Sequence, residues 1–328
     1  MLTRLELAAN TALVQDRAFG AMIGLAIGDS LGDAARTPEN QQRFGITMDF
    51  DGRTALSTDD TEFAILTAKT LIETRGNMTV DDVVRSWRAH VVAQDALPRG
   101  GASEIEAAEN LRRGLYPPYS GEYNSHCLSD GAAMRVTPIG IACAGDPARA
   151  ARLAEIDACV SHSRDGIWGA QAVAAAVAAA MAGGTVDEVI DAGKRFVPEE
   201  SWLHHTLTRA LEIASRADCL EDAWMPLHTD LWTSYKAVVP EAVSQAFALF
   251  KLSKGDFRRG VIYAGNFGRD ADTLGAIVGA LCGALVGASS IPERWIQKTR
   301  YPSGICLRFT KGLDIAEIAA ELANLVSP

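Results

Sequence analysis

Apolar residues recur at helical spacing along most of this chain, whereas the alternating pattern typical of strands is scarce. The C-terminal segment 314–326 places Ile315, Ile318, Leu322 and Leu325 on one face of a helix. The same spacing predicts further helices over 60–73, 80–93, 166–181, 202–217 and 240–252. No segment repeats the alternation of strand and helix that builds a parallel sheet. The sequence therefore predicts an all-α fold with at most one or two short strands.

Two apolar segments carry a glycine at every fourth position. The two series are Gly20, Gly24, Gly28 and Gly32, and then Gly275, Gly279, Gly283 and Gly287. An interior glycine costs a helix about 1 kcal/mol relative to alanine, so such a series implies a compensating close contact. We expect these backbones to pack closely against each other or against neighbouring helices. The apolar run 274–291 is just long enough to span a bilayer, but the similar helices elsewhere in the chain favour a buried helix of a soluble protein.

The chain shows no internal division. Neither a linker nor a low-complexity segment interrupts it, and glycine- and proline-rich loops lie at 97–104, 115–131 and 267–273. We therefore expect one compact domain over residues 1–328. The formal net charge of −10 argues against non-specific binding to nucleic acid or to an anionic membrane. Residues 1–20 contain acidic side chains and no continuous apolar stretch, so we expect no secretory signal and a cytoplasmic location.

Acidic residues and threonines cluster directly before two of the apolar segments. One cluster contains Thr58, Asp59 and Asp60, and the other contains Asp270, Asp272 and Thr273. Neighbouring carboxylates repel each other, and a helix N-terminus, a basic partner such as the adjacent Arg269 or a bound cation would offset that repulsion.

Helix capping and metal binding are the two interpretations of these clusters. A single carboxylate is enough for a cap, and each cluster has two. Their hard oxygen ligands suit Mg²⁺, Mn²⁺ or Ca²⁺ better than zinc. The spacing alone leaves capping and salt bridges open as alternatives.

Other common catalytic patterns are missing from the sequence. There is no HExxH, GxGxxG, P-loop or GxSxG motif, and the six cysteines form no CxxC pair. The adjacent His204 and His205 point in different directions on a helix and do not form a zinc site. His162 lies in a polar turn before an apolar helix, where it is either a functional histidine or a hydrogen-bonded residue at the helix start.

Five motifs in order resemble the ADP-ribosylglycohydrolase family, over about residues 18 to 300. They are GLAIGDSLG, STDDTEFAI, SDGAAMRVTPIGIA, VSHSRDGIWGAQAV and GRDADTLGAIVGALCGALVG. The resemblance implies a compact all-α fold of orthogonal helices with a binuclear magnesium centre, or manganese, at the base of a cleft. By this resemblance the metal ligands are Thr58, Asp59, Asp60, Asp270, Asp272 and Thr273.

The resemblance also implies residues for the substrate and for catalysis. Asp130, Gly131, Met134 and His162 would line the ADP-ribose side of the cleft. Two cations would hold ribose hydroxyls and activate a water, with Asp59 or Asp272 sharing the proton transfer. The sequence departs from the family pattern at two positions. Arg36 stands where members often have a glutamate associated with substrate contact, and Asp130 stands where they often have an asparagine.

Three functions are consistent with the sequence. The first is metal-dependent hydrolysis of an ADP-ribosyl bond, on a protein arginine or on a small ADP-ribose derivative. The second is hydrolysis of a simpler N-riboside or nucleoside with the same metal centre, which the substitution at Arg36 makes conceivable. The third is a non-enzymatic binding protein, which the complete set of ligand residues disfavours.

Overall fold

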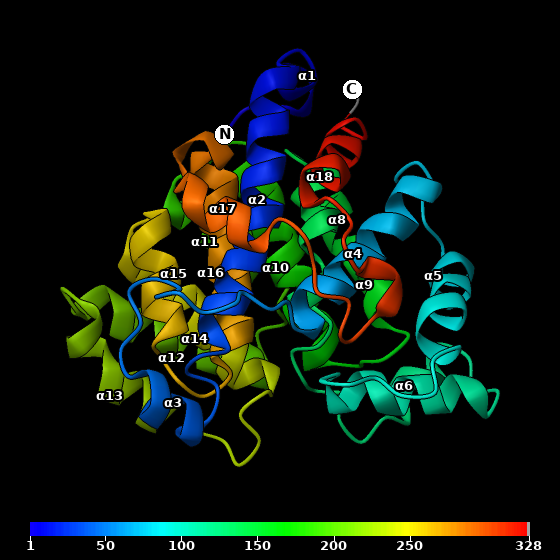
Figure 1. The fold of residues 1–328 in the computed structure, drawn as a ribbon, viewed down its shortest axis with the longest axis horizontal. Helices are drawn as coiled ribbons and strands as arrows, with labels where there is room; N and C mark the ends of the chain where they lie inside the picture. Colours follow the sequence, from blue (N-terminus) through cyan, green and yellow to red (C-terminus); the bar gives the residue numbers. More distant parts are fainter. Residues whose placement is uncertain (327–328) are drawn as a thin grey trace.

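Helices α2 (Thr11–Gly32) and α16 (Ala271–Val286) lie side by side at the centre of the computed structural model, which describes residues 1–326 (Figure 1). Their glycines face each other. A Cβ atom added to Gly28 would lie 1.8 Å from the Gly275 carbonyl oxygen, and one added to Gly24 would lie 2.2 Å from that of Gly279. The close backbone contact that the glycine spacing predicts is therefore confirmed, and any larger side chain would separate the helices.

Four helices pack around this pair and contribute to the core. They are α4 (Asp59–Glu73), α10 (Asp165–Met181), α14 (Val239–Ser253) and α15 (Phe257–Gly265). Helix α10 is apolar on all sides and almost entirely buried, as expected of a helix enclosed by others. Such enclosure explains why its sequence shows little amphipathic pattern.

The remaining helices pack around this core, and the short helix over 137–142 is itself fully buried. They are α1 (Arg4–Ala8), α3 (Pro38–Phe44), α5 (Val80–Trp87), α6 (Ala102–Arg112), α7 (Tyr119–Glu122), α8 (Thr137–Ala142), α9 (Pro147–Ala158), α11 (Val186–Lys194), α12 (Trp202–Arg216), α13 (Leu220–Asp230), α17 (Glu293–Thr299) and α18 (Ile315–Ala323). Residues 1–326 contain no strand, only an isolated bridge between Ser129 and Val238, which confirms the predicted all-α fold.

Most predicted helices begin and end within a few residues of the observed ones, and two differ in an informative way. The predicted helix 80–93 is α5 followed by a π-helical turn, Arg88–Val92. The apolar run 274–291 ends as a helix at Val286, because Gly287 adopts a φ of 78° and closes the helix. Within residues 1–326 no helix has the length and apolar character needed to cross a membrane.

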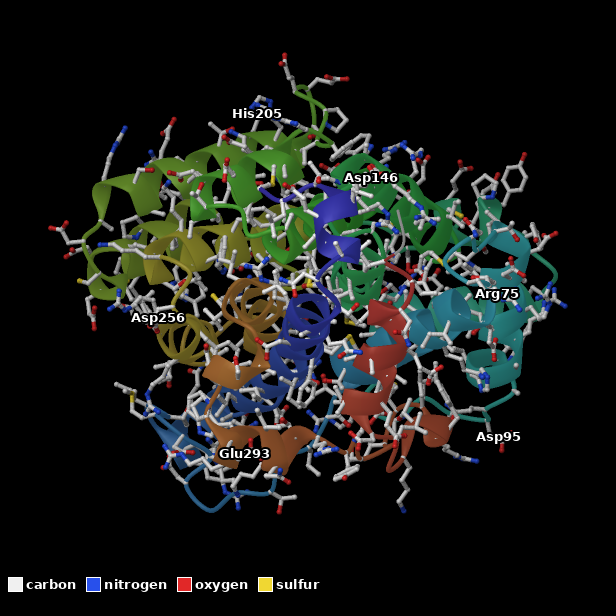
Figure 2. All side chains as sticks on the ribbon, turned by 90° about the horizontal axis from the view of Figure 1, so that it is seen from above. Arg75, Asp95, Asp146, His205, Asp256 and Glu293 are labelled. Carbon is white, nitrogen blue, oxygen red and sulfur yellow. The ribbon has the colours of Figure 1, made fainter. Side chains whose placement is uncertain are left out.

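Charged side chains mostly point outward. Figure 2 shows Asp95, Asp256 and Glu293 at the periphery, and all three are exposed. The acidic residues that begin α4 and α16 are exceptions, since they are buried at the centre. Buried carboxylates need partners or must take up protons, so their surroundings are the natural place to look for function.

Candidate metal centre

Three aspartates from two distant segments meet at the centre of the fold. Carboxylate oxygens of Asp59, Asp60 and Asp272 lie within 4.8 Å of one another, and each residue is at most 4% exposed. One oxygen each of Asp60 and Asp272, the Oδ1 atom, is buried with no hydrogen-bond partner among the described residues. Orphaned carboxylate oxygens grouped in this way form a donor set that suits a hard divalent cation. The triad could therefore hold a metal ion.

The electrostatics of the triad favour a bound cation as well. Burial raises the pKa of Asp59 to about 7, with Arg36 opposing and Asp272 adding to the rise. Burial and the neighbouring Asp270 likewise raise the pKa of Asp272 to about 7. The pKa of Asp60 is also raised well above its usual value, first by burial and then by Asp29. A bound cation would relieve this crowding of negative charge.

Asp29, near the end of α2, fixes the start of α4. Its carboxylate accepts hydrogen bonds from the Thr58 backbone N–H at 3.0 Å and from the Thr58 hydroxyl at 2.7 Å. It also accepts the Thr61 backbone N–H at 3.3 Å. Asp29 thus takes N–H groups that the helix itself leaves unpaired, and it holds Asp59 and Asp60 against α2. Nothing local to the STDDT motif identifies Asp29, which lies about thirty residues upstream.

Capping explains only part of the two clusters. Thr58 is the N-cap residue of α4, and its side chain accepts the Asp60 backbone N–H. Asp270 occupies the N-cap position of α16 but makes no side-chain cap hydrogen bond. Thr273 is buried and lines the same hollow as the aspartates. Five of the six residues implied as ligands thus line one hollow, and the sixth, Thr58, caps α4 and donates its hydroxyl to Asp29 and Asp60.

Asp59, Asp60, Asp270 and Asp272 together form an acidic cluster. Two basic residues contact this acidic cluster, and neither is the adjacent Arg269. Arg36 Nη1 lies 2.8 Å from Asp272 Oδ2, and Lys236 Nζ lies 3.1 Å from Asp270 Oδ1. Arg269 instead pairs with buried Glu241, with Nη2 2.9 Å from Oε2. Of the alternatives that the sequence leaves open, a basic partner is therefore present, but it is not Arg269. Its backbone adopts a φ of 56°, and its side chain contacts the residues around α14 instead.

A hollow of about 180 Å³ opens over the triad and contains most of the residues implied for the substrate. Asp130, Gly131 and Met134 line it together with Arg36 and the acidic cluster. Burial, followed by Asp270 and Asp60, raises the pKa of Asp130 well above its usual value. A carboxyl with such a raised pKa holds its proton more strongly, so it resembles a neutral hydrogen-bonding group more than a second anion.

His162 does not line this hollow. It is 1% exposed and lies behind Ser129, with Nε2 2.9 Å from the Ser129 hydroxyl and Nδ1 2.7 Å from the Ser161 hydroxyl. Burial, and then Arg135, lowers the pKa of His162 well below its usual value, so the ring is neutral. Any influence of His162 on a ligand would pass through Ser129.

The chain of hydrogen bonds continues from Ser129 to an acidic residue that the sequence alone does not single out. The Ser129 hydroxyl donates to Ser103 at 2.8 Å, and Ser103 donates to Glu104 Oε2 at 2.7 Å. Glu104 is fully buried and lines the hollow. A Cβ atom on Gly131 would lie 2.2 Å from Glu104 Oε1, so Gly131 makes room for this carboxylate.

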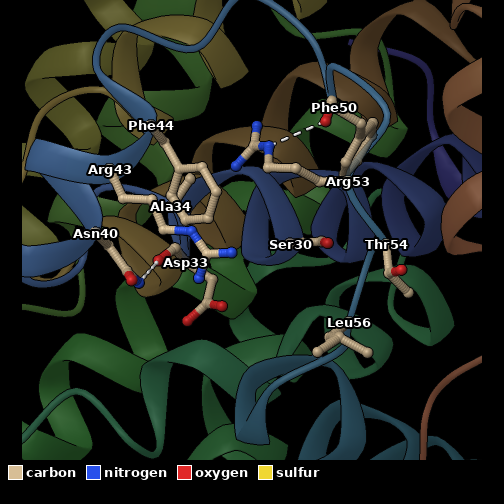
Figure 3. A pocket seen from close by; sticks show the side chains of 10 residues that line it. All are labelled: Ser30, Asp33, Ala34, Asn40, Arg43, Phe44, Phe50, Arg53, Thr54 and Leu56. Carbon is tan, nitrogen blue, oxygen red and sulfur yellow. Dashed lines mark hydrogen bonds between the residues drawn. The ribbon is translucent and has the colours of Figure 1, made fainter.

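A second hollow, lined by Ser30 and Asp33 and by arginines of the following segment, is larger, about 350 Å³, and differs in character. Figure 3 shows Arg43 and Arg53 beside Phe44, with Asp33 and Ser30 below them. The two guanidinium groups lie 5.0 and 4.9 Å from the Phe44 ring centre. This second hollow contains no member of the aspartate triad, so it is not the candidate metal centre.

Comparison with known proteins agrees with this geometry. The ADP-ribosylglycohydrolase family model matches residues 10–327. An uncharacterised protein of Archaeoglobus fulgidus is 31% identical over 299 residues, which are 87% of this chain and 92% of that protein. The ADP-ribosyl-[dinitrogen reductase] glycohydrolase of Rhodospirillum rubrum is 24% identical over 300 residues, which are 87% and 90% of the two chains. A solved structure titled ADP-ribosylglycohydrolase-related protein complex has the same fold, with a TM-score of 0.68, 24% identity and coverage of 96% and 99%.

Proposed function

The chain belongs to the ADP-ribosylglycohydrolase family of hydrolases, and from this premise we propose that it cleaves the glycosidic bond of an ADP-ribosyl group with the help of a divalent cation. The observation that carries the proposal is the buried triad of Asp59, Asp60 and Asp272, with its orphaned oxygens at the floor of a hollow. These three residues would bind one of the two magnesium or manganese ions that the sequence resemblance implies. The substrate is an ADP-ribosylated arginine of a protein or a small ADP-ribose derivative.

The name of the Rhodospirillum rubrum relative supports this substrate class, because it describes removal of ADP-ribose from dinitrogen reductase. The composition of the hollow supports it too. Arg36 and Lys236 line it beside the carboxylates, so both anionic and hydroxyl groups of a ribosyl ligand would find partners.

Each group in the hollow has a chemical role in this proposal. A divalent cation, when bound, would hold ribose hydroxyls and favour ionisation of an attacking water. Asp59, Asp60 and Asp272 would bind it, with Thr58, Asp270 and Thr273 completing the surroundings. Asp59 or Asp272 would accept the proton of the water as the bond at the anomeric carbon opens. Asp130, Gly131 and Met134 would contact the ligand, and His162 would orient Ser129.

The test is product analysis with defined substrates. Wild-type protein loaded with Mg²⁺ or Mn²⁺ is incubated with ADP-ribosyl-arginine, O-acetyl-ADP-ribose and a nucleoside panel, and the products are identified by mass. We expect cation-dependent release of ADP-ribose and a loss of at least about 100-fold in kcat for Asp272→Ala. Asp95→Asn, at an exposed position, is the matched control. Absence of release from every ADP-ribosyl substrate would contradict the proposal.

A simpler N-riboside or nucleoside is the second candidate substrate. Two observations favour it: the hollow is small, and Arg36 occupies part of it by reaching Asp272. In that case the same assay would release a free base from a nucleoside while ADP-ribosyl-arginine remains intact.

A further inference from the structure

The carboxylate oxygens of the acidic cluster fall into two groups with different partners. Asp60 Oδ1 and Asp272 Oδ1 are buried and have no hydrogen-bond partner among residues 1–326. In contrast, Asp272 Oδ2 is 2.8 Å from Arg36 Nη1, and Asp270 Oδ1 is 3.1 Å from Lys236 Nζ. The Asp272 carboxylate therefore has the positive charge of Arg36 at one oxygen, and its other oxygen is free to face Asp59 and Asp60.

Arg36 is well placed to act as a permanent cation. It follows the end of α2 by four residues, and its side chain is 27% exposed, against 2% for Asp272. It lines the same hollow as the triad. A guanidinium group stays charged at every pH the folded protein experiences, and it has five donors and no acceptor. It can therefore neutralise a carboxylate but cannot ligate a metal ion.

We propose that the Arg36 guanidinium takes the place of a second divalent ion, so that the centre of this protein binds one ion, at Asp59, Asp60 and Asp272. The inference rests on the proposed function, because it concerns the same cation-dependent site. Its physical basis is that a divalent ion and a guanidinium would compete for Asp272 Oδ2 and repel each other at the short distance between them. Lys236 likewise places a positive charge beside Asp270 and would compete with an ion for its carboxylate.

This arrangement changes what the site offers a ligand. A second ion would bind ligand oxygens by coordination and could exchange with solvent. Arg36 instead supplies hydrogen-bond donors in a fixed planar fork and remains part of the chain. The positive charge that faces Asp272 therefore does not depend on the concentration of the metal.

The test counts bound ions, without reference to activity. Purified full-length protein is stripped with a chelator and titrated with Mn²⁺ by calorimetry, with the bound metal measured by mass spectrometry. We expect one Mn²⁺ per chain for wild type and for Arg36→Lys, which keeps the positive charge. We expect two for Arg36→Glu, which replaces the guanidinium by two ligand oxygens. Arg43→Gln, an exposed arginine of α3, is the matched control and should bind one.

Electron paramagnetic resonance gives an independent reading. Two Mn²⁺ ions sharing a carboxylate couple magnetically, so Arg36→Glu should show a coupled spectrum that wild type lacks. If Arg36→Glu fails to fold by circular dichroism, Arg36→Gln removes the charge with little change in size, and it should bind a second, weaker Mn²⁺.

Three results would overturn the inference. Two ions in wild type would show that Arg36 moves aside, while leaving the proposed hydrolase intact. One ion in folded variants lacking the positive charge at position 36 would show that this residue does not exclude the second. No ion in any variant, together with hydrolysis unaffected by chelator, would contradict the cation-dependent mechanism as well.

Discussion

Arg135 supplies the positive charge that pairs with two buried carboxylates at and behind the wall of the hollow. It is completely buried, with Nε 2.7 Å from Asp157 Oδ2 and Nη1 3.3 Å from Glu104 Oε1. Its guanidinium also lies 5.1 Å from the ring centre of Trp87. A buried charge is tolerated only with complete pairing, and here the pairing orients Glu104 at the wall of the hollow.

We therefore predict that Arg135→Gln lowers the free energy of unfolding by about 3–5 kcal/mol, because two buried carboxylates lose their partner. Urea unfolding followed by circular dichroism measures the change. Arg209→Gln is the matched control: Arg209 pairs with Asp230 at the surface, where solvent screens the pair, so its loss should cost clearly less stability than that of Arg135. Equal costs for the two substitutions would contradict the role assigned to Arg135.

At the same scale, the sequence indicates the acidic residues of the site but not their partners. Two carboxylates before an apolar helix exceed what capping requires, so Asp59, Asp60, Asp270 and Asp272 stand out without a structure. Lys236 and Glu104 carry no such local signal, and Arg36 stands out only as a departure from the family pattern, not as a partner of Asp272. Their contacts join residues far apart in the chain, and sequence adjacency even suggests the wrong partner, Arg269.

At the level of elements, the contact between α2 and α16 positions the two halves of the site. Asp29 follows Gly28 on α2 and holds the start of α4, while Asp272 stands in the first turn of α16, close to Gly275. A Cβ atom on Gly28 would lie 1.8 Å from the Gly275 carbonyl oxygen. The distance between these backbones therefore determines how far Asp272 lies from Asp59 and Asp60.

We predict that Gly28→Ala weakens Mn²⁺ binding by at least about 10-fold and lowers the free energy of unfolding by about 1–3 kcal/mol, because the methyl group pushes the helices apart. Calorimetric titration and urea unfolding measure the two effects. Gly20→Ala is the matched control at the far end of the contact, where a Cβ atom would lie 2.3 Å from the Gly283 carbonyl oxygen. It should lose similar stability but retain Mn²⁺ affinity. An equal loss of Mn²⁺ affinity in both variants would show that the helix separation at Gly28 does not determine metal binding.

The elements themselves were largely predictable, because helical periodicity and glycine spacing are local properties of the sequence. Segment 60–73 corresponds to α4 and segment 166–181 to α10, each to within one residue. The end of α16 at Val286 depends instead on the positive φ of Gly287, beside Asp16 of α2. The arrangement of helices around the central pair follows from tertiary packing, which no local pattern specifies.

At the scale of the whole molecule, one continuous core connects the parts of the site. The cluster of buried apolar residues extends from Leu7 to Val326, and it includes residues of α2, α4 and α16. This continuity supports the proposal that residues 1–328 form a single domain. The acidic centre would then be part of the cooperative folding unit, so that binding a cation there would stabilise the entire chain.

The pH dependence of this stabilisation follows from the raised carboxyl pKa values. Burial is the main cause that raises the pKa of Asp59 and of Asp272 from 3.8 to about 7. Between about pH 4 and 7, the folded cation-free protein holds protons that the unfolded chain releases, so its stability falls as the pH rises through this window. A cation needs the ionised carboxylates and displaces those protons. Its stabilising effect should therefore be greatest above about pH 7 and decrease below it.

We predict that Mn²⁺, at one fixed concentration of about 100 times its Kd at pH 8, stabilises the protein by about 2.7 kcal/mol at about pH 8 and by clearly less at about pH 5.5, where its Kd is larger. Differential scanning calorimetry with Mn²⁺ or with a chelator measures the difference in Tm at each pH. Asp60→Asn should abolish the Mn²⁺ effect at both pH values, because it removes one of the triad carboxylates. Asp95→Asn, at an exposed position, should preserve it. A Mn²⁺ effect that is equal or larger at about pH 5.5 would contradict binding at the buried aspartates, because an ion bound there must displace protons held by raised pKa values.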